Sequence, residues 1–283
     1  MVQIAKLSMI EQLKDIWATC FSDSEEYIDL FFKTYFSPEH CLVWMEDEKP
    51  VAMLHMLSCC YVHEERQIDG HYLFALATLP AFRRRGIMAH LIDAALDRAK
   101  QLGHKFSVLV PAEKRLVAYY QQFGFAYPTR LTVTRLNRSE LCGLSKPIDG
   151  CEQTTLTADE LCAVRRRYFC EKGYIEWPLA YIDFYLRQLA HDPGNAIVLR
   201  DEQGDIGYAL CDEWEGRCRI LELCGKKEIC HKLYTLVLER YASTQFEVRT
   251  RGDKTALPFG YYKILSEEDN LFSDQVYFSL AMD

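Results

Sequence analysis

The sequence lacks the features that mark membrane, secreted and nucleic-acid-binding proteins. No uncharged run approaches the ~18–20 residues that a transmembrane helix needs. Residues 1–17 lack the basic start and long apolar stretch of a signal peptide. Lys and Arg number 33 against 41 Asp and Glu, which gives a net charge of −8. We therefore expect a cytoplasmic protein that binds neither a membrane nor nucleic acid.

Metal and redox patterns are also missing, although the chain holds 12 cysteines. No two of them form a C-x-x-C pair, so neither a zinc knuckle nor a redox motif is indicated. Most lie inside apolar runs, which favours reduced thiols that pack as small hydrophobic side chains. His55, His63 and His71 recur at eight-residue spacing, but this spacing matches no metal template, and no metal site is expected.

Length and charge leave room for two domains and an amine substrate. At 283 residues, 49% of them apolar, the chain can form two domains of roughly 140 residues, each with its own core. The acidic surplus suits a surface that is charged for solubility, and it also suits a cationic or amine substrate. The sequence does not indicate an oligomeric state.

Hydrophobic periodicity divides the first half into helices and strands. Helices are expected at 8–18, 24–35, 86–102 and 113–123, and strands at 41–46, 51–60, 72–79, 105–110 and 131–136. Ser8 is the expected N-cap of the first helix, and Gly103 the stop of the third. The strand–helix–strand run over 105–136 predicts a parallel pair of strands joined by a right-handed crossover.

The second half repeats this order after a linker. Residues 137–153 are poor in large apolar groups, so we place the linker there. Helices follow at 158–170, 178–189 and 228–241, with a hairpin at 196–211 and strands at 219–224, 245–250 and 275–281. The pattern predicts an α/β (α+β) protein with two domains, residues 1–138 and 150–283, each a mixed twisted sheet flanked by helices.

The segment around residues 76–89 has the composition of a phosphate-binding turn. A strand ends near Thr78, and Arg83-Arg84-Arg85-Gly86 lead directly into the longest helix. Consecutive backbone N–H groups and the positive end of the helix dipole favour a pyrophosphate, and Gly86 permits close approach. Arginines add charge-assisted hydrogen bonds, and a strand that splays here can pair with an extended amide chain. A solvated basic turn that caps a helix is the alternative.

Two motifs resemble the GNAT acetyltransferase superfamily. Arg83–Met88 is similar to its motif A, Q/R-x-x-G-x-G/A, with Met88 where glycine or alanine is usual. Tyr120–Phe125 is similar to its motif B, Y-x-x-x-G-F. The resemblance covers residues 5–136 by motif and 150–283 by layout, and it implies two tandem GNAT-like domains. In the second, Leu223–Ile229 lacks the motif A spacing, so we expect no cofactor loop there.

The resemblance implies a reaction and a site. The chain would use acetyl-CoA as co-substrate and acetylate a primary amine of a small molecule or peptide by direct attack. Tyr120 would protonate the leaving thiolate, or is instead a core tyrosine. The implied cofactor-binding residues are Leu76, Ala77 and Thr78 beside the pantetheine, and Arg83, Arg84, Arg85, Gly86, Ile87, Met88 and Ala89 at the pyrophosphate.

The general base is left open among a few carboxylates and water. The tandem layout partly resembles the enhanced-intracellular-survival family of aminoglycoside acetyltransferases, in which the C-terminal carboxylate enters the active site. That resemblance implies Asp283 as a catalytic base, beside Glu64, Glu65 and Glu113 as other candidates. A third, sterol-carrier-like domain is not expected at this length. The alternatives in function are a non-catalytic acyl-CoA-binding module and an aminoacyl or long-chain acyl transferase.

Overall fold

The computed structural model describes residues 1–191, 195–267, 272–273 and 276–281. Twelve strands follow one another side by side in a single mixed sheet, in the order β1-β2-β3-β4-β5-β13-β6-β12-β11-β10-β9-β7, and β8 joins it by pairing with β3. The strands are β1 Val2–Ile4, β2 Cys41–Glu46, β3 Lys49–His63, β4 Arg66–Thr78, β5 Phe106–Leu109, β6 Tyr127–Asn137, β7 Cys151–Thr154, β8 Tyr174–Glu176, β9 Asn195–Asp201, β10 Ile206–Trp214, β11 Arg217–Cys224, β12 Gln245–Arg251 and β13 Leu257–Ile264.

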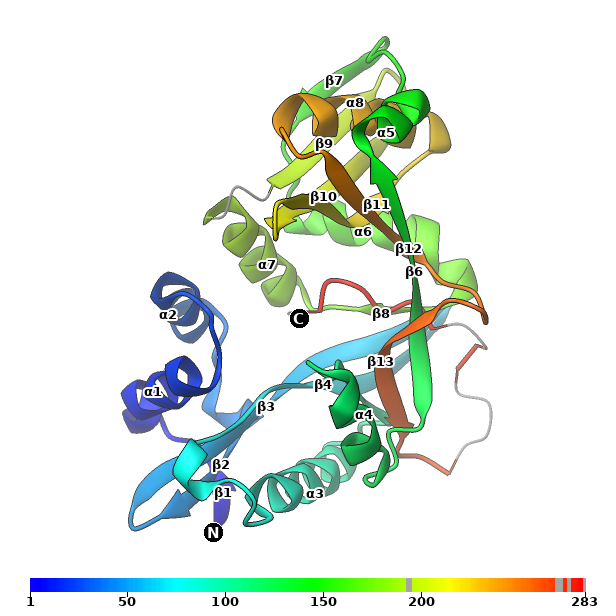
Figure 1. Cartoon of the computed structure of the whole chain (residues 1–283). Helices are drawn as coiled ribbons and strands as arrows, with labels where there is room; N and C mark the ends of the chain where they lie inside the picture. The colour runs from blue at the N-terminus through cyan, green and yellow to red at the C-terminus, as the bar shows by residue number, and fades with distance from the viewer. Residues whose placement is uncertain (192–194, 268–271, 274–275, 282–283) are drawn as a thin grey trace.

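Helices flank the sheet along its whole length (Figure 1). In the described residues they are α1 Ile10–Cys20, α2 Glu25–Thr34, α3 Ile87–Gln101, α4 Lys114–Gln121, α5 Arg138–Leu144, α6 Ala158–Phe169, α7 Leu179–His191 and α8 Lys227–Arg240. The predicted α/β (α+β) class, a mixed twisted sheet flanked by helices, is confirmed. No described helix combines the length and the apolar character needed to cross a membrane. All twelve cysteines are free thiols.

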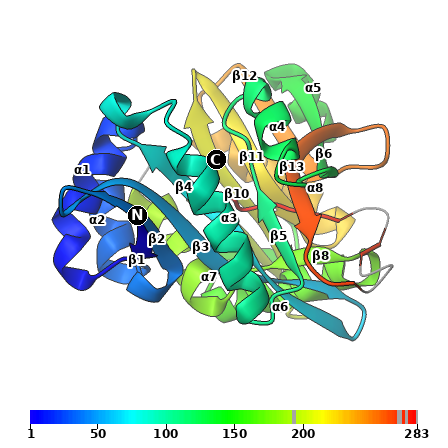
Figure 2. The same cartoon turned by 90° about the horizontal axis from the view of Figure 1, so that it is seen from below.

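The first half buries both faces of its strands, because side chains alternate between two helical layers. Met53 on β3 points into a core that contains Trp17 of α1 and Phe31 of α2. Its neighbour Leu54 points into a second core with Leu91 of α3. Helices α1 and α2 thus cover one face of the sheet, while α3 and α4 cover the other (Figure 2).

The two halves share strands at the centre of the sheet. Strand β13 lies between β5 and β6 and is antiparallel to both. On its other edge, β6 pairs with β12 of the second half over seven residues. The prediction that β5 and β6 form a parallel pair is therefore wrong, because β13 separates them. The division into residues 1–138 and 150–283 stays a prediction, although β13 of the second range completes the sheet of the first.

The C-terminal strands were the least predictable elements. Strand β13 was missed because Pro258 and Gly260 interrupt its apolar pattern, and the β13–β6 register shifts between Pro258 and Tyr261. Gly260 is required there, since a Cβ would lie 2.8 Å from the Leu109 carbonyl oxygen. The strand expected at 275–281 is wrong for the described residues 276–281, which form only an isolated bridge from Tyr277 to Tyr174.

Two local expectations are also corrected. Ser8 does not cap the first helix, because it lies inside a 3₁₀ turn and α1 begins at Ile10 without a side-chain cap. The stretch expected as a linker contains α5, which opens with a capping box between Asn137 and Glu140. Leu141 of this helix packs into the core of the second half. The Asn-x-x-Glu spacing was the available signal for that helix.

Loss of the shared strand gives the first prediction. Residues 1–138 expressed alone lack β13, so β5 and β6 lose the neighbour that pairs with both of them. We expect no cooperative thermal transition by circular dichroism, and we expect recovery of the transition when residues 139–283 are co-expressed. A cooperative melt of the isolated fragment at the temperature of the full chain would contradict this dependence.

Candidate functional site

The candidate site begins where two parallel strands part. Strands β4 and β5 pair only over Gly70–Phe106, His71–Ser107 and Tyr72–Val108. Beyond Tyr72, β4 continues to Thr78 and pairs with β3 alone. Its register against β3 shifts where Ala75 adopts a left-handed backbone with φ of +47°. The free edge of β4 therefore offers backbone groups that an extended amide chain can pair with.

The three residues expected beside the pantetheine lie at the end of this free edge. Ala77 is buried toward α1 and α2, whereas Leu76 packs toward α3. The Thr78 hydroxyl is buried and has no hydrogen-bond partner among the described residues. Its carbonyl oxygen accepts a hydrogen bond of 2.9 Å from Arg83 Nε. The strand end is thus ordered while one of its polar atoms is left without a partner.

The turn that follows leaves the start of α3 open. Gly86 is the N-cap, with φ of +74°, and a Cβ built on it would meet nothing within 4 Å. The N–H groups of Ile87, Met88 and Ala89 occupy the first turn, where a helix supplies no backbone acceptor. An open approach to these groups at the positive end of the helix dipole is the geometry of an anion site.

The three arginines of the turn have different partners. Arg83 is held on the Thr78 carbonyl, and Arg85 forms a 2.8 Å ion pair with Glu46 and stacks over the Phe82 ring. Arg84 is exposed and makes no hydrogen bond or ion pair with the described residues. Its backbone is left-handed, with φ of +62°. Of the three, Arg84 can therefore turn toward a bound phosphate without first breaking an internal contact.

Tyr120 lies in the same apolar cluster as this turn. Its side chain is 8% exposed on α4 and packs edge-on against Phe125. The cluster also contains Ile87, and Leu76 and Met88 pack against it. Burial, with a smaller effect of Tyr119, raises the pKa of the Tyr120 phenol to about 12. The hydroxyl has no hydrogen-bond partner among the described residues, so it is a protonated donor that is free to engage a ligand.

The candidate bases that the structure describes are carried by segments other than the turn. Glu64 and Glu65 lie in the β3–β4 turn, at the opposite end of β4 from Thr78. A strand of this length spans about 40 Å at the usual rise per residue. Glu113 is the exposed N-cap of α4 and pairs with Arg115. Asp283 lies outside the described residues. The structure therefore brings the free edge of β4, the turn and Tyr120 into one cluster, whereas Glu64 and Glu65 lie at the far end of β4 and Glu113 pairs with Arg115.

Two of the three histidines singled out in the sequence, His55 and His71, are buried. His55 is buried among aromatic rings that include Trp17 and Phe31, and burial lowers its pKa to about 3. The Nδ1 atom of His71 lies 3.2 Å from the Nδ1 atom of His104. Among the residues that the structure describes, no group of three His, Cys, Asp or Glu side chains could hold a metal ion.

The corresponding turn of the second half is closed. A Cβ on Gly225, between β11 and α8, would lie 2.7 Å from the Gly207 Cα. The backbone of Gly207 therefore already fills the approach to this turn. Lys226, the N-cap of α8, pairs with Asp201 and Asp205. These carboxylates neutralise the position where a phosphate would need positive charge.

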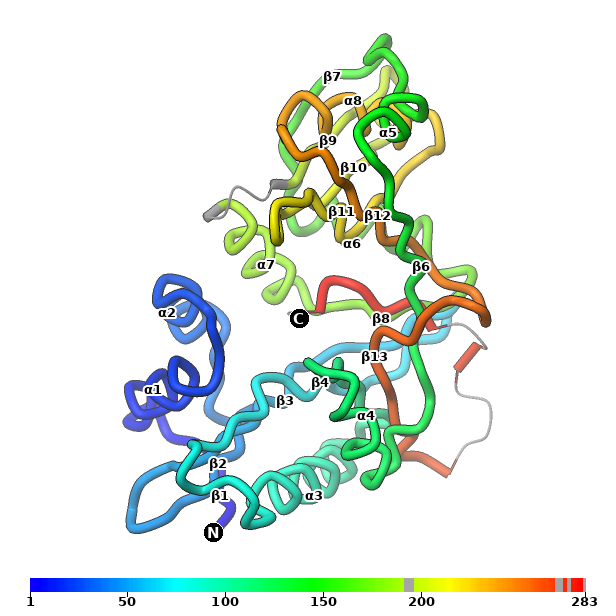
Figure 3. Tube along the Cα trace, viewed as in Figure 1, coloured from blue at the N-terminus to red at the C-terminus, as the bar shows by residue number. Residues whose placement is uncertain are grey.

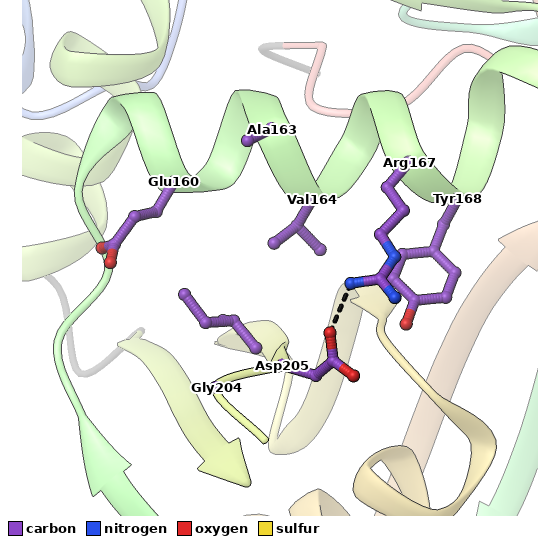
Figure 4. A pocket seen from close by; sticks show the side chains of 8 residues that line it. Glu160, Ala163, Val164, Arg167, Tyr168, Gly204 and Asp205 are labelled. Atoms are coloured by element: carbon purple, nitrogen blue, oxygen red, sulfur yellow. Dashed lines mark hydrogen bonds and ion pairs between the residues drawn. The ribbon is translucent and has the colours of Figure 1, made fainter. Parts of the chain in front are cut away.

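A pocket lies beside this closed turn (Figure 4). It is open to solvent, measures about 170 Å³, and lies between α6 and the β9–β10 turn. The Asp205 carboxylate pairs there with Arg167 as well as with Lys226. Because its basic groups are already paired, the pocket offers no surplus positive charge to an anion.

The resemblance to a known family directed the C-terminus to the site, but the packing of the segment Val276–Ala281 was missed. The ring of Phe278 lies 5.7 Å from that of Tyr72, where β4 and β5 part. No local motif predicts this contact, because it joins residues that are about 200 positions apart in the chain. Apolar character over 276–281 was the local signal, and it was interpreted as a strand.

Comparison with known proteins gives one matching family model and several solved structures of similar fold. Residues 2–127 match the family model of the acetyltransferase (GNAT) domain. A protein from Enterococcus faecalis V583, described as a probable N-acyltransferase, shares 14% identity at a TM-score of 0.76, over 94% of this chain and 72% of its own. A GCN5-related N-acetyltransferase from Kribbella flavida shares 13% identity at a TM-score of 0.71, and the match covers 93% of this chain and 70% of that one.

A third solved structure with a similar fold is that of Eis1. Eis1 from Mycobacterium abscessus shares 12% identity at a TM-score of 0.67, over 94% of this chain and 74% of its own. At these identities the three structures show a common fold across nearly the whole chain. No curated protein sequence gives a significant match.

The second prediction separates ligand approach from backbone strain. Gly86 and Gly103 lie at opposite ends of α3, have φ of +74° and +79°, and both face open space. Valine at either position should destabilise the fold similarly, by about 1–2 kcal/mol for a left-handed non-glycine residue. Only Gly86→Val should abolish acetyl-CoA binding by calorimetry, because its side chain enters the approach to the α3 N-terminus. Equal binding by the two variants would refute a phosphate site here.

Proposed function

Because residues 2–127 are a GNAT acetyltransferase domain, we propose that the chain moves the acetyl group of acetyl-CoA to a primary amine of a small molecule or peptide. The observation that carries the proposal is a single cluster that contains the free end of β4, the open turn at Gly86 and the protonated Tyr120. Acyl transfer from acetyl-CoA to an amine uses these three features. The strand edge can bind the amides of the cofactor, the helix start can bind its phosphates, and the phenol can donate a proton.

Acetyl-CoA would lie across the parting of β4 and β5. Its pantetheine amides would pair with the backbone of Leu76, Ala77 and Thr78, because no described strand pairs with this part of β4 on that edge. The pyrophosphate would accept hydrogen bonds from the backbone between Arg83 and Ala89. Arg84 would add a charge-assisted hydrogen bond, and Arg83 and Arg85 would contribute positive potential from where they lie.

The reaction balances with one acid and one base. The amine nitrogen attacks the thioester carbonyl carbon, the N–C bond forms, and the C–S bond breaks with its electron pair on sulfur. Tyr120 donates its proton to that thiolate, and its raised pKa keeps the donor protonated up to at least pH 10. The proton of the amine passes to a base, for which we propose the Asp283 carboxylate or water, since Glu64 and Glu65 lie at the far end of β4.

The second half would then shape the site without binding a second acetyl-CoA. The approach to Gly225 is filled by Gly207, and Lys226 is neutralised by two aspartates. We propose that residues 150–283 are a GNAT-like domain without a cofactor loop. Twelve free thiols suit a reducing compartment, which supports a cytoplasmic location.

The third prediction concerns the proton donor. Tyr120→Phe should lower the rate of CoA release with an amine acceptor by ~10²-fold, the loss expected for a positioned general acid, with acetyl-CoA affinity nearly unchanged. The matched control is Tyr119→Phe, which removes a hydroxyl one residue away on the same helix and should retain turnover. Equal rates for the two variants would make Tyr120 a packing residue. An amine panel without turnover for the unmodified chain would favour a non-catalytic acyl-CoA-binding module.

The fourth prediction concerns stoichiometry. Calorimetric titration should give one acetyl-CoA per chain, because only the turn at Gly86 is open. Disabling the second turn by Lys226→Ala should leave both the stoichiometry and the affinity unchanged. Two equivalent sites, or a weakened affinity in Lys226→Ala, would contradict the assignment of acetyl-CoA to the first half alone.

A further inference from the structure

The C-terminal segment Val276–Ala281, here called the tail, lies between the two halves of the protein. It runs beside β8, between the strands β3 and β4 and the helices α6 and α7, as Figures 1 and 3 show. Each of its six residues is at most 5% exposed. Four of them belong to the core that also contains Trp17 of α1 and Ala75 of β4. The tail is thus an interior element that contacts the first half as well as the second.

The tail meets the first half where β4 and β5 part. Phe278 packs edge-on against Tyr72, the last residue of β4 that pairs with β5. On the other side it lies against β13, where a Cβ on Gly260 would be 3.0 Å from the Phe278 ring and 2.8 Å from the Leu109 carbonyl oxygen. Phe278 therefore lies at the parting of β4 and β5, on the face of the sheet that α1 and α2 cover. Tyr120 and α3 pack on the opposite face.

A buried polar network from the second half holds the residue next to Phe278. The Ser279 hydroxyl donates to the Glu222 carboxylate of β11 and accepts a 3.1 Å hydrogen bond from Arg165 Nη2 of α6. Arg165 Nε lies 3.2 Å from Glu222 Oε1, within ion-pair range although outside hydrogen-bond alignment. Tyr208 donates a 2.6 Å hydrogen bond to the same oxygen. Arg165, Glu222, Ser279 and Tyr208 are each at most 1% exposed.

Backbone contacts on either side of Ser279 set one conformation of the tail. The Trp177 indole donates to the Ser279 carbonyl at 2.9 Å, and the Tyr181 hydroxyl donates to the Leu280 carbonyl. Leu280 adopts a left-handed backbone with φ of +55°, which a leucine adopts only where its surroundings require it. Apolar packing alone tolerates a shift along the chain, whereas a buried charge pair has a single place for the Ser279 hydroxyl.

A buried ion pair is weak evidence for a role in stability, because desolvation of both charges offsets their attraction. Its best-attested use is to specify one arrangement among several of similar packing. Here the arrangement that it specifies is the position of the tail, since α6 and β11 of the second half both contribute charged groups to one serine of the tail.

We propose that Arg165, Glu222 and Ser279 are positioning residues for acyl transfer. They hold Phe278 at the parting of β4 and β5 and so place the wall along which the acceptor amine reaches the thioester. This inference rests on the proposed function. It gives the second half, which has no phosphate turn, a direct influence on turnover in the first half through the tail.

The test compares two variants of the network with a control. Glu222→Gln removes the charge at nearly constant shape, and Ser279→Ala removes one hydroxyl while leaving the ion pair in place, so at least the second variant should fold. Asp212→Asn is the control, because Asp212 pairs with Arg219 across β10 and β11 without contacting the tail. Each chain is measured for its melting temperature, its acetyl-CoA Kd by calorimetry, and its kcat and acceptor KM by CoA release.

Both network variants should lower kcat/KM for the amine at least tenfold, chiefly through a higher acceptor KM, while the acetyl-CoA Kd stays within twofold. The double variant should lose no more than the worse single variant, because both act through the tail. Asp212→Asn should retain the kinetics of the unmodified chain. Unchanged acceptor kinetics in Ser279→Ala, or an equal loss in Asp212→Asn, would overturn the inference while the proposed function stands. No CoA release by the unmodified chain with any amine would overturn both.

Discussion

The parting of β4 from β5 after Tyr72 and Val108 is the constraint on which the rest of the structure depends. Two parallel strands that stay paired would satisfy each other's backbone and leave nothing for a ligand. Because β4 continues past β5, its free edge can pair with amides, and its end delivers the chain to the turn at Gly86 and the start of α3. The same gap needs a far wall, which Phe278 of the tail provides. Site and tail are therefore two consequences of one unpaired strand edge.

Local chemistry made the first part of the site predictable. Gly86 before a long amphipathic helix, and Tyr120 four residues before Gly124, are patterns within single segments, and their local structure follows from φ preferences and helix periodicity. The partners of the arginines were not predictable, since Arg85 meets Glu46 from a different strand. Strand β13 was missed for a related reason. Pro258 and Gly260 weaken its local signal, and its position is set by β5 and β6 rather than by its own propensity.

The two halves show how little separates a binding turn from a closed one. Both have a strand, a glycine and a helix in the same order. At Gly86 the missing Cβ faces open space, while at Gly225 it faces the Gly207 backbone. The charges of the two turns differ as well, because Arg84 has no ion-pair partner among the described residues, whereas Lys226 pairs with two carboxylates. The same order of elements in both halves thus says nothing by itself about which half binds a ligand.

The position of β13 also bears on the order in which the protein can be completed during synthesis. Leu109 of β5 pairs with Tyr261, roughly 150 residues later in the chain, so this edge of the sheet stays uncovered until β13 has left the ribosome. The half that carries the turn at Gly86 is translated first, yet its sheet is finished only when β13 is added. A chain that stops before β13 would therefore expose an unpaired strand edge, which suits recognition by chaperones and proteases.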